Sequence, residues 1–229
     1  MSAPHQSLRA TFAPGNRSAN VHAVRGPGAD VDAGALQHAK SAAAFRAFLE
    51  SLGIDVSEPM LAGTAHRVAR SYREILGGLE ADAEPRLTSF PNTERHTGIV
   101  SVTGISFYSM CAHHFLPFFG IAHVGYVPGD RLVGLSKLGR VVDFYARRPQ
   151  LQEEMTEQIA AWLDERLAPR GVIVSLQARH MCMEMRGVSK PNVTTTTMAL
   201  RGTLQDERLQ NQFFARLRAG DKNAPTLEI

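Results

Sequence analysis

The sequence predicts an α+β fold in which an antiparallel sheet is covered on one face by helices. The prediction depends on the order of the local patterns along the chain. Two segments with helical periodicity come first, two strand-like segments follow, two more helical segments come next, and two further strand-like segments complete the series. Strand-like segments that are neighbours in the chain favour hairpins, and helices grouped between hairpins favour packing on a shared face of the sheet.

The first two helical segments precede the sheet. One is expected from Ala35 to near Gly53, and the other from about Gly63 to Leu79, with Gly77 and Gly78 marking its end. Apolar residues at helical spacing give each segment one apolar face. They are Leu36, Ala43, Phe45, Phe48 and Leu49 in the first segment, and Val68, Tyr72, Ile75, Leu76 and Leu79 in the second.

The first two strands are expected at residues 98–108 and 118–127. The first is rich in Val, Ile, Thr and Ser, which give it the character of a strand. The sequence Pro128-Gly129-Asp130 follows the second and favours a turn. Together these segments predict the first hairpin of the sheet.

The central helices are expected at residues 136–147 and 149–167. Pro149 suits the first position of a helix, and Glu153 and Glu154 complement the positive end of the helix dipole. The apolar stripe of the second helix is Leu151, Met155, Ile159, Leu163 and Leu167. Segments 172–183 and 193–201 then return to strand character, the latter through four consecutive threonines, and residues 204–229 are expected to hold a C-terminal helix and tail.

Composition places the chain among ordinary globular proteins. It has 229 residues, of which 44% are hydrophobic and 21% are charged, and its formal net charge is +3. No apolar run approaches the roughly 18 residues that a membrane span needs, so we expect no membrane partner. The mild positive charge suits an anionic small-molecule site as well as it suits a nucleic-acid surface.

The sequence divides into a tail and one domain. Residues 1–34 are rich in Ala, Gly, Pro, Ser and Asn and hold few apolar residues, so we expect a disordered or mobile tail, with a transit peptide as a weaker alternative. Residues 35–229 are expected to form one domain, made of N-terminal helices at 35–82, a core at 95–203 and the C-terminal segment at 204–229.

Both cysteines of the chain stand beside histidine, in Cys111-Ala112-His113-His114 and in His180-Met181-Cys182. Thiolate and imidazole are the ligands that zinc prefers. The spacing also allows two inert buried thiols, or a disulfide. The chain shows no secretory signal, so a reducing, cytoplasmic location is expected, and it disfavours the disulfide.

The predicted strands favour the metal interpretation. His180 and Cys182 lie two apart on a predicted strand and would share a face, and Cys111 and His114 lie three apart in a turn just before a strand. Three ligands leave one coordination position open, which favours a metal that acts on bound water. His113 would lie next to the metal without necessarily binding it, in a suitable place for proton transfer.

Basic residues near the predicted helix starts suit an anion. Ser136, Lys137 and Arg140 combine a hydroxyl and two cations with the unpaired N–H groups of a helix N-terminus, which suits phosphate oxygens. A solvated basic face is the alternative for each basic segment. Arg67, Arg70 and Arg186 could add to the same function, and together these residues would suit a polyphosphate.

Glu153 is the candidate for recognition of a base. Its carboxylate could accept two hydrogen bonds from the N1–H and the exocyclic amine of guanine. A surface acid that only complements the helix dipole is the alternative.

The motifs in order resemble the GTP cyclohydrolase I family. They are Cys-x-His-His, then Gly-Leu-Ser-Lys-x-x-Arg, then Arg-Pro-Gln-x-Gln-Glu, then His-x-Cys-x-x-x-Arg-Gly, and last a Thr-rich strand. The resemblance runs from about Gly63 to Gly202 and includes Thr64-Ala65-His66-Arg67-Val68-Ala69. Five motifs in this order and at these separations make the resemblance highly specific.

The resemblance implies a tunnelling fold, in which the sheets of several subunits join into a barrel, and a toroidal homodecamer with sites between subunits. It implies hydrolysis and rearrangement of GTP to formate and 7,8-dihydroneopterin triphosphate, the first step toward folate or tetrahydrobiopterin, with no nucleic-acid partner. The implied zinc ligands are Cys111, His114 and Cys182, and the implied catalytic residues are His113 and His180. The implied substrate-binding residues are Glu153, Gln152, Ser136, Lys137, Arg140, Arg186, Arg67 and Arg70.

One position departs from the family pattern. Ala112 stands where the family usually has Glu, so a carboxylate near the metal is missing. This departure leaves room for a paralogue that serves a deazapurine or another pterin pathway. A nitrile reductase of the same fold, with a cysteine nucleophile and a nicotinamide cofactor, is a rival interpretation. A non-catalytic nucleotide-binding module that zinc stabilises is a third.

Overall fold

The computed structural model describes residues 27–221, with side chains described from residue 34 to residue 218. The chain divides into two compact units, Met1–His66 and Arg67–Ile229. Most of the predicted tail lies outside the described residues. Among the described residues, no helix is both long enough and apolar enough to cross a membrane.

The first unit is helical. Helix α1 spans Pro27–Ser51, the short 3-10 helix η1 spans Pro59–Leu61, and helix α2 (Thr64–Ile75) begins at the end of this unit and continues into the second. The imidazoles of His38 and His66 approach to 3.3 Å between Nε2 and Nδ1 and connect α1 to the start of α2. Several large apolar side chains of this unit are exposed: Leu36, Phe48, Leu52 and Met60.

A five-stranded sheet organises the second unit, in the order β5-β2-β3-β6-β7. Its long strands are β2 (Val100–Cys111), β3 (Pro117–Val127), β6 (Gly171–His180) and β7 (Thr194–Gly202), and neighbouring members of this set pair antiparallel. The short strand β5 (Pro149–Gln150) pairs parallel with the end of β2. A separate antiparallel pair joins β1 (Ser89–Pro91) to β4 (Arg131–Val133).

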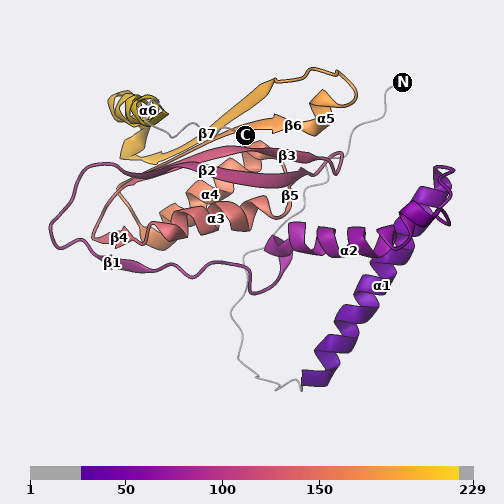
Figure 1. Ribbon diagram of the computed structural model, residues 1–229. Coiled ribbons are helices and arrows are strands. Elements are labelled where there is room, and N and C mark those ends of the chain that lie inside the picture. Colours follow the sequence, from indigo (N-terminus) through magenta and orange to yellow (C-terminus); the bar gives the residue numbers. More distant parts are fainter. Residues whose placement is uncertain (1–26, 222–229) are drawn as a thin grey trace, which may run out of the picture. The chain divides into compact units, whose positions relative to one another are not determined.

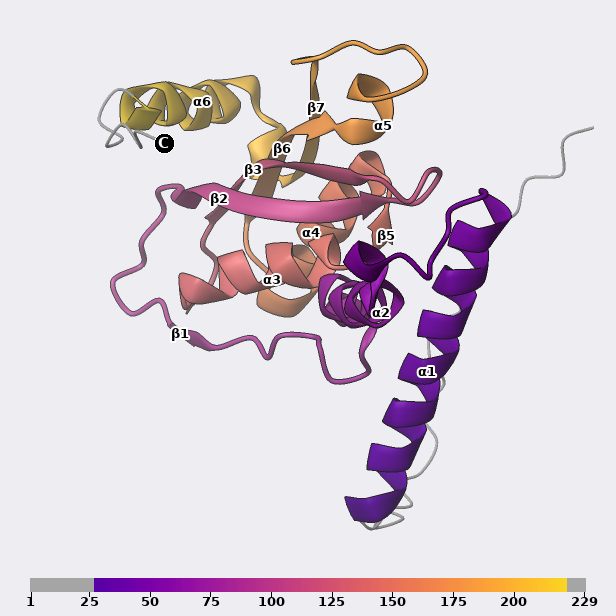
Figure 2. The same ribbon diagram turned by 45° about the vertical axis from the view of Figure 1, so that its right-hand side comes forward.

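Helices α3 (Ser136–Ala146) and α4 (Gln152–Leu167) cover one face of the sheet (Figures 1 and 2). The side chains between these layers form the main core, because alternate residues of each strand point toward the helices. Its largest fully buried members include Phe107, Phe118, Tyr126, Leu138, Met155, Ile159, Leu163 and Leu176. This layer agrees with the predicted α+β class, but the sheet is mixed and not purely antiparallel, because β5 pairs parallel with β2.

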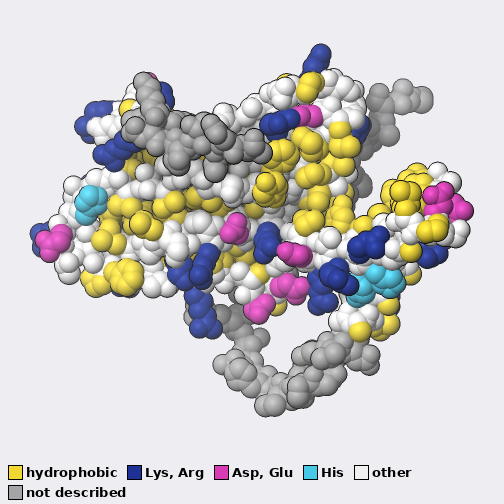
Figure 3. All heavy atoms as spheres, viewed as in Figure 1, with side chains coloured by type: hydrophobic (Ala, Val, Ile, Leu, Met, Phe, Trp, Pro, Cys, Tyr) yellow, Lys and Arg dark blue, Asp and Glu magenta, His cyan; other side chains and the backbone are white. Residues whose placement is uncertain are grey.

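Helix α6 (Glu207–Asp221) lies against the opposite face of the sheet, at one end (Figure 2). It follows the 3-10 helix η3 (Thr203–Gln205) and forms a smaller core with the strands, made of Ile99, Val127, Ile173, Leu204 and Phe213. The rest of this face has no helix over it among the described residues. Tyr108, Ile121 and Met198 are exposed there, with Tyr108 at 73%. Figure 3 shows hydrophobic side chains gathered over the strands on the side of the molecule that it presents.

A close backbone approach connects the end of α2 to α3. After α2 the chain forms the 3-10 helix η2 (Gly77–Leu79), and the N–H of Gly78 donates to the carbonyl of Arg147 at 2.9 Å. A Cβ at residue 78 would lie 2.3 Å from the carbonyl oxygen of Phe144, so only glycine fits without movement of the backbone. Helix α2 ends at Ile75, before the expected Leu79, and the two glycines belong to a separate 3-10 helix whose close packing requires glycine at position 78.

Three predicted boundaries need correction. Helix α1 begins at Pro27, before the expected Ala35, and Pro is well tolerated in the first helical turn. Pro149 belongs to strand β5 and not to a helix, so α4 begins at Gln152, although Glu153 and Glu154 still lie in its first turn. The strand predicted at 172–183 ends at His180, and a separate short helix, α5 (Met181–Glu184), follows.

Candidate metal centre

Cys111, His114 and Cys182 come together at one end of the sheet. One ligand atom from each residue lies within 4.8 Å of the others. The Sγ of Cys111 is 3.8 Å from Nδ1 of His114 and 4.0 Å from the Sγ of Cys182. Cys111 is buried, Cys182 is half-buried and His114 is exposed, so the group opens toward solvent on one side.

These separations fit a tetrahedral ion. Zinc–sulfur bonds of about 2.3 Å at a tetrahedral angle place two sulfurs about 3.8 Å apart. A disulfide would need about 2.05 Å between the sulfurs, and both cysteines are free, so the disulfide interpretation is excluded. The three predicted ligands are thus brought together, and no further group of three or more candidate ligands occurs in the described part of the chain.

The turn that carries Cys111 and His114 is closed by backbone hydrogen bonds. The N–H of Cys111 donates to the carbonyl of Leu116 at 2.9 Å, and the N–H of Phe115 donates to the carbonyl of Cys111 at 2.8 Å. The N–H of Ala112 donates to the carbonyl of Gln150 on β5, also at 2.9 Å. Gln150 is itself buried, so this turn is anchored to the body of the sheet.

Phe115 gives the same turn an unusual backbone conformation. Its φ is +54°, in the left-handed region that a bulky side chain seldom adopts. Its ring stacks on Tyr72 of α2, with centroids 5.8 Å apart and planes 11° apart. Such strain persists where surrounding contacts fix the conformation, and it is common at functional sites.

Cys182 lies on α5 and not on the strand. The prediction that His180 and Cys182 share a face of one strand is therefore wrong, because β6 ends at His180 and the chain turns into a helix. This helix lies against β3 and brings the thiol to Cys111. Burial, and then the nearby Cys111, raise the pKa of the Cys182 thiol. A divalent cation would offset both effects, because it favours thiolates.

His180 is held by two contacts at the end of β6. Its ring stacks on Phe118, with centroids 4.7 Å apart and planes 1° apart. Its Nε2 lies 2.7 Å from Oε1 of Gln152. Burial lowers the pKa of His180, and the charge of Glu153 opposes that shift. A neutral ring is therefore favoured here at neutral pH.

Gln152 is buried, with an exposed fraction of 2%, and its amide has partners on both sides. Its Nε2 lies 3.1 Å from the carbonyl oxygen of Thr195, 3.1 Å from Oγ1 of Thr197 and 3.3 Å from the carbonyl oxygen of Leu176. These acceptors require the amide nitrogen on their side, so Oε1 faces His180. The Nε2 of His180 is then the donor, which leaves its Nδ1 as the nitrogen that can accept a proton.

His113 is exposed beside the metal group and is not a member of it. Its ring meets that of His114 edge to face, with centroids 6.2 Å apart. Ala112 precedes it and is also exposed, so the place of the missing carboxylate faces solvent.

Part of the predicted substrate set lies at this end of the sheet. Glu153 is exposed in the first turn of α4, next to Gln152. Arg186 is exposed just after α5. Arg67 and Arg70 belong to α2, the helix whose Tyr72 stacks on Phe115.

Ser136, Lys137 and Arg140 are not brought to the metal group within one chain. Ser136 and Lys137 lie at the start of α3, next to β4, and Arg140 follows about one turn later, whereas the end of α3 leads into β5 and the metal turn. Helix α3 has 11 residues, which at about 1.5 Å per residue separate its ends by about 16 Å. This basic segment therefore lies toward the other end of the subunit.

Three contacts that matter at this site had no sequence signal of their own. They are the stacking of Tyr72 on Phe115, the hydrogen bond from His180 to Gln152, and a bidentate ion pair between Arg179 and Glu184. Each joins residues that are distant in sequence or lie on different elements. The sequence gave only indirect indications of these contacts: the apolar spacing that includes Tyr72, and the alternation of residues along β6.

The fold and the site together define an α+β protein with a Cys₂His group that could hold a metal ion at the end of a helix-covered sheet. Residues 41–218 match the model of the GTP cyclohydrolase I family. A protein named GTP cyclohydrolase 1 from Mycobacteroides abscessus is 52% identical over 167 residues, which cover 72% of this chain and 81% of that one. Proteins of the same name from Mycolicibacterium gilvum and Mycobacterium tuberculosis are 49% and 50% identical, over 74% and 71% of this chain and 85% and 81% of theirs.

The chain belongs to the GTP cyclohydrolase I family. Among solved structures, the apo crystal structure of an archaeosine synthase QueF-Like has a TM-score of 0.39 and 18% identity, over 46% of this chain and 94% of that one. That likeness is too weak to bear on fold or function.

Proposed function

We propose that this protein converts GTP and water to formate and 7,8-dihydroneopterin triphosphate, with zinc as its metal. The observation that carries the proposal is the approach of Cys111, His114 and Cys182 to within 4.8 Å of one another, on a chain of this family. Two thiols and one imidazole suit zinc better than magnesium or calcium, which prefer oxygen ligands. Three ligands leave a fourth position for water or substrate.

The metal would supply Lewis acidity, which makes water a better nucleophile near neutral pH. The protein's own groups supply the remaining chemistry. We assign proton transfer to the purine ring nitrogens, as the imidazole ring of GTP opens and formate leaves, to His113 and His180. His113 is exposed beside the ligands, and His180 presents Nδ1 because Gln152 occupies Nε2.

Gln152 has a positioning role in this proposal. The sequence suggested that it helps Glu153 to hold guanine, yet its amide is buried and already has protein partners. The exposed carboxylate of Glu153 is the better candidate for the guanine edge, because it can accept from N1–H and from the exocyclic amine.

The triphosphate would be held by cations from two subunits. Arg186, Arg67 and Arg70 belong to elements at or next to the metal end of one subunit. Ser136, Lys137 and Arg140 lie toward the other end, so they would serve the metal centre of a neighbour. Contacts to the triphosphate would fix the position of the purine relative to the metal, so that the binding free energy orients the reacting group.

This arrangement requires an oligomer, and we propose the family's homodecamer with sheets joined into a barrel. Two exposed apolar surfaces support assembly: one on the helical unit, at Leu36, Phe48, Leu52 and Met60, and one on the uncovered sheet face, at Tyr108, Ile121 and Met198. Large exposed apolar patches often mark interaction sites. We place the assembly in the cytoplasm, where cysteine thiols stay reduced.

The test is to incubate zinc-loaded protein with GTP and to measure formate and pterin fluorescence, with zinc content determined on the same sample. We expect equal amounts of both products. A nitrile reductase would instead consume reduced nicotinamide with a nitrile substrate. A folded, zinc-loaded protein that binds GTP and yields neither product would contradict the proposal.

A further inference from the structure

A bidentate ion pair joins the end of β6 to α5. The Nε of Arg179 donates to Oε1 of Glu184 at 2.7 Å, and its Nη2 donates to Oε2 at 2.5 Å. Glu184 is two residues from Cys182, on a helix of four residues. The pair lies outside the ligand set and outside the predicted substrate set.

The geometry of this pair separates it from ordinary surface ion pairs. Exposed pairs contribute little to stability, because solvent screens them and side-chain entropy opposes them. Here the Glu184 side chain is only 8% exposed, and both of its oxygens accept from one planar guanidinium. Bidentate pairs of this kind are the stronger class and fix orientation as well as distance.

Arg179 is held in place on its own side. It lies on the face of the sheet opposite to the helices, since its neighbours Ala178 and His180 face the core. Its guanidinium carbon is 5.9 Å from the ring centroid of Phe119, and that ring stacks on Tyr108 at 5.7 Å. The cation is therefore anchored to the sheet through two aromatic side chains.

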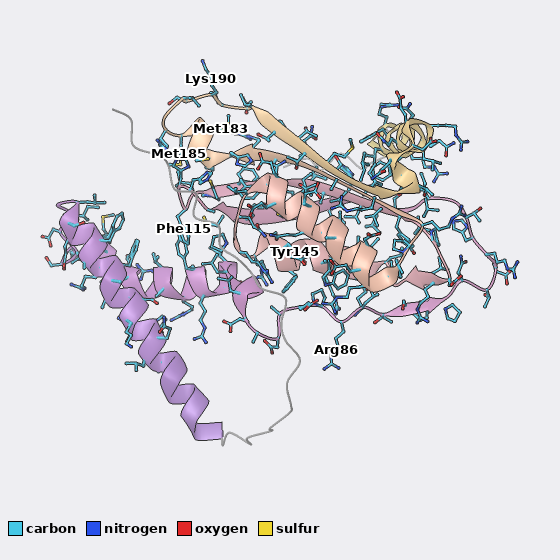
Figure 4. The ribbon with its side chains drawn as sticks, turned by 180° about the vertical axis from the view of Figure 1, so that it is seen from behind. Arg86, Phe115, Tyr145, Met183, Met185 and Lys190 are labelled. Atoms are coloured by element: carbon cyan, nitrogen blue, oxygen red, sulfur yellow. The ribbon has the colours of Figure 1, made fainter. Side chains whose placement is uncertain are left out.

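Helix α5 needs such an anchor. A helix of one turn is unstable in isolation, because nucleation fixes several residues for a single hydrogen bond. The segment after it is exposed at Met185 and Val188, and Figure 4 shows Met183 and Met185 at the same end of the sheet as Phe115. The N–H of Lys190 donates to the carbonyl of Met183 at 2.9 Å, so the segment that returns toward β7 is also joined to this short helix.

We propose that Arg179 and Glu184 are positioning residues for the metal centre. Their ion pair holds α5 so that the Cys182 thiolate faces Cys111 and His114, and it sets where Arg186 leaves the helix. The metal part of this inference stands on the geometry alone. Only the statement about Arg186 rests on the proposed function.

The test measures zinc affinity by competition with a chromogenic chelator, and the visible spectrum of the Co²⁺-loaded protein. Glu184→Ala removes both acceptors and should raise the zinc dissociation constant about 10- to 100-fold, the usual effect of losing a residue that orients a metal ligand. The thiolate-to-cobalt absorption should weaken or shift. Glu184→Gln keeps one acceptor oxygen, so its loss should be smaller.

Arg179→Met is the second test variant and removes the other partner of the ion pair. The Arg179 side chain is 42% exposed, so the variant should still fold. Its effect should match that of Glu184→Ala, and the double variant should lose little more than either single one, because both remove one shared contact. The matched control is the ion pair between Arg201 on β7 and Glu157 on α4. Arg201→Met should leave zinc affinity unchanged, and urea unfolding should show all variants folded.

Unchanged zinc affinity in both Arg179→Met and Glu184→Ala would overturn the inference, and so would fully additive losses in the double variant. The result does not depend on turnover. The two proposals can fail separately. If zinc affinity falls in these variants but the parent protein does not convert GTP, the proposed function is wrong and this inference still holds.

Discussion

At the scale of single residues, Gln152 connects the helix layer to the metal end of the sheet through one amide. Its nitrogen faces acceptors on β6 and β7, and its oxygen faces His180. The amide therefore has one allowed orientation, and that orientation selects the tautomer of His180.

Gln152→Glu should destabilise the protein by about 1–3 kcal/mol, because a carboxylate cannot donate to the oxygens that surround Nε2. Urea unfolding at pH 7 measures this free energy. Gln177→Glu is the control, since Gln177 is exposed on β6, and it should stay within about 0.5 kcal/mol of the parent. Equal stability of Gln152→Glu and the parent protein would contradict the burial and partners assigned to this amide.

His113→Ala should keep zinc and lose turnover, because His113 lies beside the ligands and is not one of them. Loss of a proton-transfer group commonly costs about 10²- to 10⁴-fold in rate. Zinc content and kcat are measured on the same preparation, with His96→Ala as a control outside the site. Loss of zinc in His113→Ala would show that His113 is a ligand.

Residue identities predicted which side chains come together as candidate ligands better than they predicted the residues that support them. Cys111, His114 and Cys182 carry a chemistry that few residue types share, so their spacing was informative. The role of Gln152 could not be assigned in the same way, because an amide can hydrogen-bond to a substrate or to a neighbouring side chain equally well. Only its burial and its partners on β6 and β7 distinguish the two roles.

At the scale of elements, the start of α4 brings two neighbouring side chains to different environments. Gln152 points into the protein, while Glu153 is exposed in the same turn. Successive residues of a helix point about 100° apart, so such a change within one step is expected. This geometry makes Glu153 available to a ligand that approaches the metal end.

Glu153→Gln should reduce the preference for GTP over ITP by about tenfold or more, since a hydrogen bond to a charged group contributes about 1.5–3 kcal/mol and ITP lacks the exocyclic amine. The ratio of kcat/KM for the two nucleotides is the measurement. Glu154→Gln, one residue further along the same turn, is the matched control and should leave the ratio unchanged. An unaltered ratio in Glu153→Gln would remove this residue from guanine recognition.

Elements were predicted well where the periodicity was long and poorly where tertiary contacts decide. The strands at 100–111 and 117–127 and the helices at 136–146 and 152–167 lie close to the expected ranges. The change from strand to helix at Met181 was missed, because Met181, Cys182 and Met183 continue the strand-like segment without a turn signal and a four-residue helix has no period of its own. Strand β5 was missed for the same reason, since it has only two residues.

At the scale of the whole molecule, the proposed site needs two subunits. The candidate metal ligands lie at one end of the sheet, and the basic start of α3 lies one helix length from the end of α3 that leads toward them. No sequence pattern shows which surfaces contact a neighbouring subunit. From the sequence, a site shared between two subunits could therefore be inferred only from the family resemblance. The fold of the single chain gives the geometric reason for a shared site, because it places the basic segment and the candidate ligands toward different ends.

Gel filtration should show a species far larger than the 25.0 kDa chain. Co-expression of His113→Ala with Lys137→Ala should then restore activity, because mixed neighbours combine an intact metal centre with an intact basic segment. Random assembly predicts recovery of about a quarter of the parent activity. A monomer, or mixed assemblies as inactive as each variant alone, would contradict sites shared between subunits.

The proposed metal centre is one ion held by two sulfurs and one imidazole. X-ray absorption at the zinc edge of the purified protein measures this directly. We expect two sulfur neighbours at about 2.3 Å and two nitrogen or oxygen neighbours at about 2.0–2.1 Å, one from His114 and one from a non-protein ligand. A shell without sulfur, or one made of four sulfurs shared between chains, would contradict the proposed centre.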